Sequence, residues 1–268
     1  MDWDPEFIER SAMLEPLRPG AMRLRAHVHW PRRDALERLL AERPIVTGVG
    51  ARLRLVAPSG KPYESRIYLH GEMQFREGEW HDLFNLLAWL AYPRTKAALN
   101  EAHHLESLRL PEAASNERSN RSRVRDALTV FDESGAIAVS SDADLLDDLK
   151  AFRWKQLFWE RRERVSTRMR IHLFGHALFE KALHPYVGMT AHALLLPVAH
   201  ELITAPPARL LEAVDASAAP LVCALKTPQA LSPLPLLGVP GWWRDNAAAA
   251  FYDDEGHFRP GRTQRSNK

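Results

Sequence analysis

Two hydrophobic periodicities follow one another along this chain, and together they restrict it to a fold that contains both helices and strands. One set of segments repeats apolar side chains at helical spacing, which predicts helices with one buried face. These segments are residues 32–43, 79–104, 143–164 and 207–216. Pro93 interrupts the second segment, so we expect two helices that meet at Tyr92.

A second set of segments alternates apolar and polar side chains, as half-buried strands do. Two pairs of such segments flank a turn with glycine, and each pair predicts a β-hairpin: 51–57 with 64–70, and 126–131 with 136–140. Residues 168–174 predict a further strand, after which Gly175 begins a helix, although one continuous helix over 168–184 is an alternative. The short apolar run 190–198 predicts a buried strand.

These elements predict a single α+β domain. We expect a mixed sheet built from two hairpins plus one or two further strands, packed on one side by four to six helices. The expected boundaries are an N-terminal arm over 1–24, the domain over 25–262 and a disordered tail over 263–268. Residues 231–262 are rich in proline, glycine and aromatic side chains, and we expect them to wrap around the core.

Composition excludes several classes of protein. Cys223 is the only cysteine, so neither an intrachain disulfide nor a thiolate metal cluster is possible. The acidic start lacks the features of a signal peptide, and no apolar run approaches the ~18 residues of a membrane span, which predicts a cytoplasmic protein without a membrane partner. The net charge of +2 does not indicate nucleic-acid binding, and the basic clusters at 118–125 and 259–268 are expected as solvated loops.

Histidines close to carboxylates are the most informative candidates for a site, because both groups bind divalent ions. His172, His176 and Glu180 are spaced four residues apart. If a helix begins after Gly175, His172 leaves the face that His176 and Glu180 share, and those two can still bind one ion. A simple hydrogen-bonded pair is the alternative. His192 is a further candidate metal ligand.

His81 and Asp82 form the second candidate pair, on a predicted helix. An adjacent His and Asp is similar to the metal-binding pair of some phosphohydrolases, so we expect these residues to complete the metal shell or to act as a base. Adjacent residues point about 100° apart on a helix, so they share an ion only at a helix end or through a water. Alternatively, Asp82 caps the helix.

Carboxylates also bracket the second predicted hairpin. Asp126 and Asp132 are kept as candidates because strand ends often carry hydrolytic sites, and Arg125 is expected to stabilise developing charge. Asp132 and Glu133 alternatively form only the turn, and Arg125 and Asp126 only a salt link. Lys96 could hold a phosphate, although a solvated helix face is the simpler interpretation.

Several long segments resemble one known family. The segments WHDLFNLLAWLAYPRTKAALNEAH, RDALTVFDESGA, FGHALFEK, GMTAHALLL and LGVPGWWRDN occur in order, and the similarity extends from about residue 25 to residue 262. They resemble the proteobacterial domain of unknown function 3025. The resemblance implies a bacterial, cytoplasmic protein that forms one unit, and it implies no activity.

The candidate residues support two hypotheses. The first is a divalent-metal-dependent hydrolase that acts on phosphate esters or nucleic acid. Its substrate would then be a small molecule or a nucleic acid. The second is a non-catalytic interaction module in which the His and carboxylate pairs are structural and the Trp-rich C-terminal extension forms an interaction surface. Convergence of the imidazoles and carboxylates on one cavity distinguishes the first hypothesis from the second.

Overall fold

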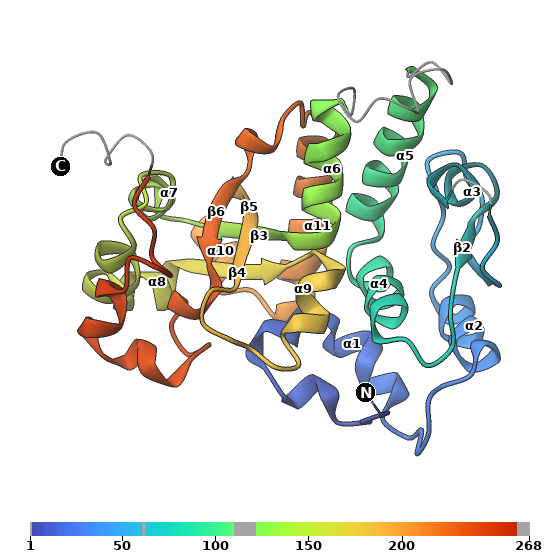
Figure 1. The fold of residues 1–268 in the computed structure, drawn as a ribbon, viewed down its shortest axis with the longest axis horizontal. Coiled ribbons are helices and arrows are strands. Elements are labelled where there is room, and N and C mark those ends of the chain that lie inside the picture. Colours follow the sequence, from blue (N-terminus) through green and yellow to red (C-terminus); the bar gives the residue numbers. More distant parts are fainter. Residues whose placement is uncertain (1, 61–62, 110–121, 262–268) are drawn as a thin grey trace.

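A mixed four-stranded sheet forms the centre of the molecule (Figure 1). The architecture comes from a computed structural model, which describes residues 2–60, 63–109 and 122–261. The strand order is β4-β3-β5-β6. Its strands are β3 (Gly135–Ser140), β4 (Met169–Leu173), β5 (Thr190–Pro197) and β6 (Ser232–Pro235). β3 and β5 are parallel, and the two outer strands run antiparallel to their neighbours.

Burial explains why β3 lies inside the sheet. All six of its residues are buried, because their side chains are small or apolar and both faces of the strand are covered. Its neighbour β5 alternates more strongly between buried and less buried residues. β3 is therefore a fixed, buried strand, and it holds in place the residues that directly precede it in the chain, 123–134.

Helices cover the sheet and extend the core on the side of the small sheet (Figure 1). The longest are α5 (Pro93–Arg109) and α11 (Pro207–Cys223), which pack against each other. Asp215 of α11 accepts hydrogen bonds from the backbone N–H groups of Arg94 and Thr95, so it caps α5 from a distant part of the chain. The other helices near the candidate site are α4 (Trp80–Ala91), α6 (Arg123–Ser134) and α9 (His176–Lys181).

A second, two-stranded parallel sheet lies beside these helices. It consists of β1 (Arg54–Val56) and β2 (Glu72–Gln74), joined by α3 (Tyr63–His70) and preceded by α2 (Arg33–Glu42). Gly71 allows the chain to enter β2, because it has φ +67° and a Cβ there would lie 1.9 Å from the Arg52 carbonyl oxygen. This small unit places the first residues of α3 next to α5.

The α+β class is confirmed, but neither predicted hairpin forms. Residues 64–70 belong to α3, and residues 126–131 belong to α6. In α6 the buried side chains of Ala127, Leu128 and Phe131 lie on one helical face, and Ser122 caps the helix by accepting from the Arg125 N–H. So short an alternating segment matches either period, and burial of this face together with the cap favours the helix. The described residues also contain more helical segments than the four to six expected.

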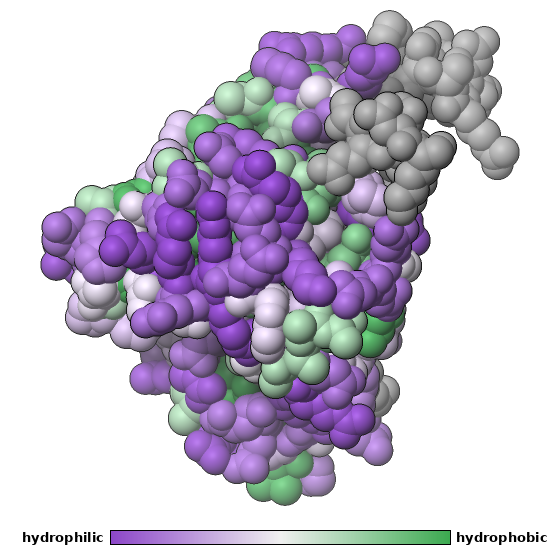
Figure 2. All heavy atoms as spheres, turned by 90° about the vertical axis from the view of Figure 1, so that its left-hand side faces the viewer, coloured by the Kyte–Doolittle hydropathy of each residue, from purple (hydrophilic) through white to green (hydrophobic). Residues whose placement is uncertain are grey.

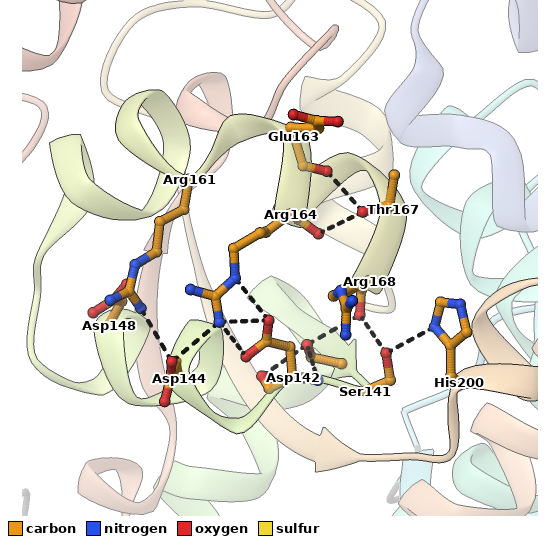
Figure 3. Close-up of polar contacts among 11 residues, drawn as sticks. Ser141, Asp142, Asp144, Asp148, Arg161, Glu163, Arg164, Thr167, Arg168 and His200 are labelled. Carbon is orange, nitrogen blue, oxygen red and sulfur yellow. Dashed lines mark hydrogen bonds and ion pairs between the residues drawn. The ribbon is translucent and has the colours of Figure 1, made fainter.

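The prediction of one long helix over 143–164 is also wrong. α7 (Ala143–Lys150) ends before Phe152, whose φ of 58° breaks the helix, and a π-helical turn precedes α8 (Arg162–Arg168). Ion pairs hold the broken segment together: Arg164 binds Asp142, and Arg161 binds the fully buried Asp148 (Figure 3). These charges therefore stabilise a bend rather than a helix surface.

Other predictions from periodicity are confirmed. Helices begin after Pro31 and meet at Tyr92, β5 forms, and α11 covers the predicted segment 207–216. The predicted strand and helix on either side of Gly175 are β4 and α9, which excludes one continuous helix over 168–184.

The described segments nearest to the two termini pack against the core. Residues 7–24 form η1 (Phe7–Glu9), η2 (Ala12–Leu17), α1 (Arg18–Ala21) and η3 (Met22–Leu24), with Phe7 and Leu14 fully buried. After α10 (His200–Ile203) and α11, the C-terminal residues add β6 and then pack Trp242 and Trp243 partly against the core. The end of the molecule that carries α7 and α8 is largely hydrophilic (Figure 2).

Two expectations concern segments that lie wholly or partly outside the described residues: the tail over 263–268, and residues 118–121 of the basic loop expected over 118–125. Residues 123–125 belong to α6, so the loop expectation is wrong for them. Within the described part of the chain, no helix is long and apolar enough to cross a membrane.

Candidate metal centre

The junction between β4 and α9 positions His176. The backbone N–H groups of Phe174 and Gly175 both donate to the carbonyl oxygen of Gly135, which fixes the end of β4 against the start of β3. Gly175 approaches this segment so closely that a Cβ would lie 2.5 Å from the carbonyl carbon and oxygen of Glu133. Glycine is therefore required here for packing, and α9 begins at His176 directly beside Glu133.

His176 is buried, and its protonation is determined by its neighbours. Its Nδ1 lies 2.8 Å from the backbone carbonyl oxygen of Asp132. A carbonyl only accepts, so Nδ1 carries the hydrogen and Nε2 holds a lone pair. Burial lowers the pKa of this imidazole to about 4, against the opposing effect of the Asp132 charge. At neutral pH the ring is uncharged, with Nε2 as a free acceptor.

His81, at the second position of α4, presents the same atom to His176. Its Nδ1 lies 3.3 Å from Oε2 of Glu180, so this nitrogen donates to a carboxylate, and in the neutral ring Nε2 carries no hydrogen. The two Nε2 atoms are 3.0 Å apart. Two lone pairs at this distance repel each other unless a proton or a cation lies between them.

Glu133 supplies a third ligand atom to the same point. Its Oε2 lies 3.6 Å from Nε2 of His176, and ligand atoms of His81, Glu133 and His176 all lie within 4.8 Å of one another. Burial raises the pKa of Glu133, and the negative charge of Asp132 acts in the same direction. A cation at this point would remove both effects.

The spacing agrees with a small divalent ion. Metal–nitrogen bonds of about 2.0–2.1 Å place two nitrogen ligands of a tetrahedral ion about 3.3 Å apart. The observed 3.0 Å between the two Nε2 atoms is close to this value. Two histidines and one glutamate leave a fourth position open, which is the ligand set of catalytic rather than structural zinc sites. Non-haem iron sites use a similar set.

A buried ion pair lies behind His176. Lys96 of α5 binds Asp132 at 2.5 Å, and their side chains are only 4% and 16% exposed. Burial, the largest single influence, raises the pKa of Asp132, but the charge and hydrogen bond of Lys96 act together with His176 and His103 to bring the pKa to about 2. Asp132 therefore stays ionised, and the pair fixes the backbone that holds His176.

The three potential ligands open into a cavity of about 370 Å³. Its walls come from α3, α4, α6 and α9, together with Gln74 of β2, Arg76 and Pro58, and include Tyr63, Glu64, Asp82, Asn85 and Asp132. Burial raises the pKa of Glu64 to about 7, and the Asp132 charge adds to the effect. A carboxyl group with this pKa can accept and return a proton near neutral pH.

Comparison with known proteins identifies the family. The family described as "Protein of unknown function (DUF3025)" matches residues 53–262, which is more than half of the chain. The chain belongs to the DUF3025 family. No curated protein and no solved structure matches it. The matched region contains all three potential metal ligands and the cavity walls, so the DUF3025 segment by itself carries the site.

The structure brings together three of the residues singled out from the sequence: His81, His176 and Glu180. Glu180 contacts the Nδ1 of His81 and orients that ring from outside the potential ligand set. Asp82 lines the cavity, but its carboxylate accepts two hydrogen bonds from the Arg76 side chain and one from the Arg76 backbone N–H. Its expected role as a base conflicts with this pairing.

The other three predicted residues lie elsewhere among the described residues. His192 of β5 contacts the Ser134 hydroxyl, at 3.0 Å, and does not join the potential ligand set. Arg125 is exposed in the first turn of α6, and Asp126 is half-buried beside it; neither lines the cavity. The Arg125 charge nevertheless reaches Glu64, whose pKa it lowers slightly.

Sequence reasoning missed Glu64 and underestimated Glu133 and Lys96. Glu133 was expected mainly at a hairpin tip, whereas it lies in the last turn of α6. The signal for that helix was present in Ser122, a cap residue followed by helically spaced apolar side chains. Lys96 was expected on a solvated face and is buried. Glu64 carried no local signal.

Proposed function

We propose that this protein is a divalent-metal-dependent hydrolase whose ion is bound by His81, His176 and Glu133. One observation carries the proposal: the Nε2 atoms of His81 and His176 face each other at 3.0 Å beside the Glu133 carboxylate, and the Nδ1 of each ring already donates to an oxygen. The alternative is a proton on Nε2 of His81 that is donated to Nε2 of His176, and metal content distinguishes the two. A divalent ion satisfies all three groups at once.

The surrounding residues support a catalytic site. Glu180 would orient His81, and the Asp132 carbonyl would orient His176, as outer partners of metal-binding histidines do. The open side of the ligand set faces the cavity, where a bound ion would lower the pKa of a water molecule. Glu64 lines the same cavity and is the candidate general base.

Metal content tests the proposal. Protein purified without a histidine tag should contain about one equivalent of Zn, Mn, Fe or Ni, or should take it up after stripping and dialysis. His176→Ala and Glu133→Ala should lose that ion while remaining folded by circular dichroism. His192→Ala is the matched control and should retain it. Absence of stoichiometric metal, with no uptake, would support the structural role of the pairs in an interaction module.

A further inference from the structure

We infer that the substrate at this centre is an uncharged acyl compound, an amide or an ester, whose carbonyl oxygen accepts from Tyr63 and whose N–H, in an amide, donates to Asn85. The inference deepens the proposed hydrolase function and rests on it. This substrate class differs from the phosphate esters and nucleic acids that the sequence led us to expect.

Charge balance in the cavity is the first reason. Two described cations beside it are already neutralised: Arg76 by Asp82 through two side-chain hydrogen bonds, and Lys96 by Asp132. Phosphate esters need cations that are free to bind their oxygens. Among the described residues that line the cavity, Arg76 is the only Lys or Arg, and it is paired. A bound divalent ion would be balanced largely by Glu133, so a polyanion would meet little net positive charge.

The second reason is a donor and an acceptor next to each other on the cavity wall. The Tyr63 hydroxyl accepts from Nδ2 of Asn85 at 2.9 Å, so its own hydrogen is available to donate. Burial raises the pKa of Tyr63 well above its usual value, which keeps that hydrogen in place. Oδ1 of Asn85 is buried without a partner among the described residues. An O–H donor and an amide acceptor complement the C=O and N–H of an amide, and the C=O of an ester.

Residues that line the cavity could carry out the hydrolysis. Glu64 would take a proton from a water molecule activated by the bound ion, and the water oxygen would form a bond to the carbonyl carbon while the π electrons move to the carbonyl oxygen. Tyr63 would donate to that oxygen as its charge develops. The electrons on that oxygen would then re-form the C=O bond as the bond from carbon to nitrogen or to ester oxygen breaks, its electrons would go to the leaving atom, and protonated Glu64 would return the proton to it. The products are a carboxylic acid and an amine or alcohol.

Binding of two small probes tests the inference. Protein loaded with its metal is titrated with acetamide, an uncharged amide, and with inorganic phosphate, by isothermal calorimetry. We expect acetamide to bind at least tenfold more tightly, and Tyr63→Phe to weaken it about tenfold while metal content stays the same. Equal or tighter binding of phosphate, or no binding of either probe to metal-loaded protein, overturns the inference.

Turnover provides a second readout. p-Nitrophenyl acetate and an acyl p-nitroanilide are compared with p-nitrophenyl phosphate and bis-p-nitrophenyl phosphate. Acyl cleavage that falls more than 100-fold in Glu64→Gln supports the inference, and phosphate cleavage with the same dependence on Glu64 overturns it. Failure of the proposed function is distinguishable from failure of this inference, because the proposed function fails only if the wild-type protein binds no metal at all.

Discussion

Nε2 of His81 lies 3.0 Å from Nε2 of His176, and each ring already donates its Nδ1 hydrogen to an oxygen. The folded chain thus holds two acceptors against each other, and a cation converts this repulsion into two bonds. A ligand that binds only the folded state stabilises it by about 2.7 kcal/mol at a free concentration 100 times its Kd.

The first prediction is a thermal shift. Adding the bound ion to stripped protein should raise Tm by roughly 5–10 °C, because about 2.7 kcal/mol corresponds to this range for a chain of this size. Differential scanning calorimetry measures the shift. His192→Ala should show the same shift as wild type, and His176→Ala should show none. An equal shift in both variants would place the ion elsewhere.

The second prediction concerns Glu180. Glu180→Gln removes the carboxylate that accepts from Nδ1 of His81, so the ring loses orientation and basicity. Metal affinity should fall about 10- to 100-fold, the usual effect of removing an outer partner of a metal-binding histidine. Competition with a chromogenic chelator measures it. Glu212→Gln, on the exposed surface of α11, is the matched control and should leave affinity unchanged.

The third prediction concerns the buried pair behind the site. Lys96→Met leaves Asp132 charged and unpaired, and also removes a cation near the rings of Trp89 and Phe174. Unfolding in urea should show a loss of about 3–5 kcal/mol. Combining Lys96→Met with Asp132→Asn should recover most of the loss, because the uncompensated charge is then absent.

The exposed neighbour of Lys96 provides the control for this experiment. Arg94 is 58% exposed and pairs with Glu212 only at 3.9 Å. Arg94→Met should change stability by less than about 0.5 kcal/mol. A similarly small effect of Lys96→Met would contradict its role as the partner of a buried charge.

The fourth prediction is a pH dependence of catalysis. Glu64 accepts a proton only when it is ionised, and its pKa of about 7 in the metal-free protein predicts that kcat/KM rises with pH, reaches half of its maximum near pH 7 and levels off above it. A bound cation moves this rise to lower pH, because it favours the carboxylate. Glu64→Gln should lose the rise along with most of the activity. A profile that keeps its shape in Glu64→Gln would exclude Glu64 as the base.

The fifth prediction concerns His172, which lies away from the site. Its Nδ1 is buried without a partner among the described residues, and burial lowers its pKa to about 4. His172→Leu should therefore stabilise the protein by about 1 kcal/mol at pH 7, since an unsatisfied polar atom is removed. His29→Leu, at an exposed position, should change stability by less than about 0.5 kcal/mol.

Acid should enlarge the difference at His172. The unfolded chain binds a proton at this residue below its ordinary pKa of about 6.5, whereas the folded chain does not until about pH 4. Wild-type stability therefore falls relative to His172→Leu as pH decreases from 6.5 to 4. Urea unfolding at pH 7.0, 5.5 and 4.5 measures the trend. A gap that stays constant would mean that His172 is protonated in the folded state.

Local patterns predicted those parts of the fold that depend on local interactions. Pro93 correctly separated two helices, and Gly175 correctly separated a strand from a helix, because each residue acts on its own backbone. Over 64–70 and 126–131 the alternation was too short to distinguish the two periods, and burial by distant helices decided the outcome. The parallel pairing of β1 with β2 joins residues 18 positions apart and had no local signal.

The candidate site was predicted only in part, for the same reason. His176 and Glu180 share a short helix, so spacing revealed them, and His81 was recognised by its residue type. Glu133 reaches the site because two backbone segments touch at Gly175, and Glu64 reaches it because the small sheet turns α3 toward α5. Such contacts depend on packing between distant segments, which spacing along one segment does not encode.

The contact between Gly175 and the Glu133 carbonyl has a consequence for recognising other proteins with this centre. Any larger side chain at that position would push apart the two segments that deliver an imidazole and a carboxylate to one point. In a relative that keeps the chemistry, the dipeptide Gly-His should thus persist even where the surrounding sequence diverges. Its replacement would mark lineages in which the protein has taken up another task.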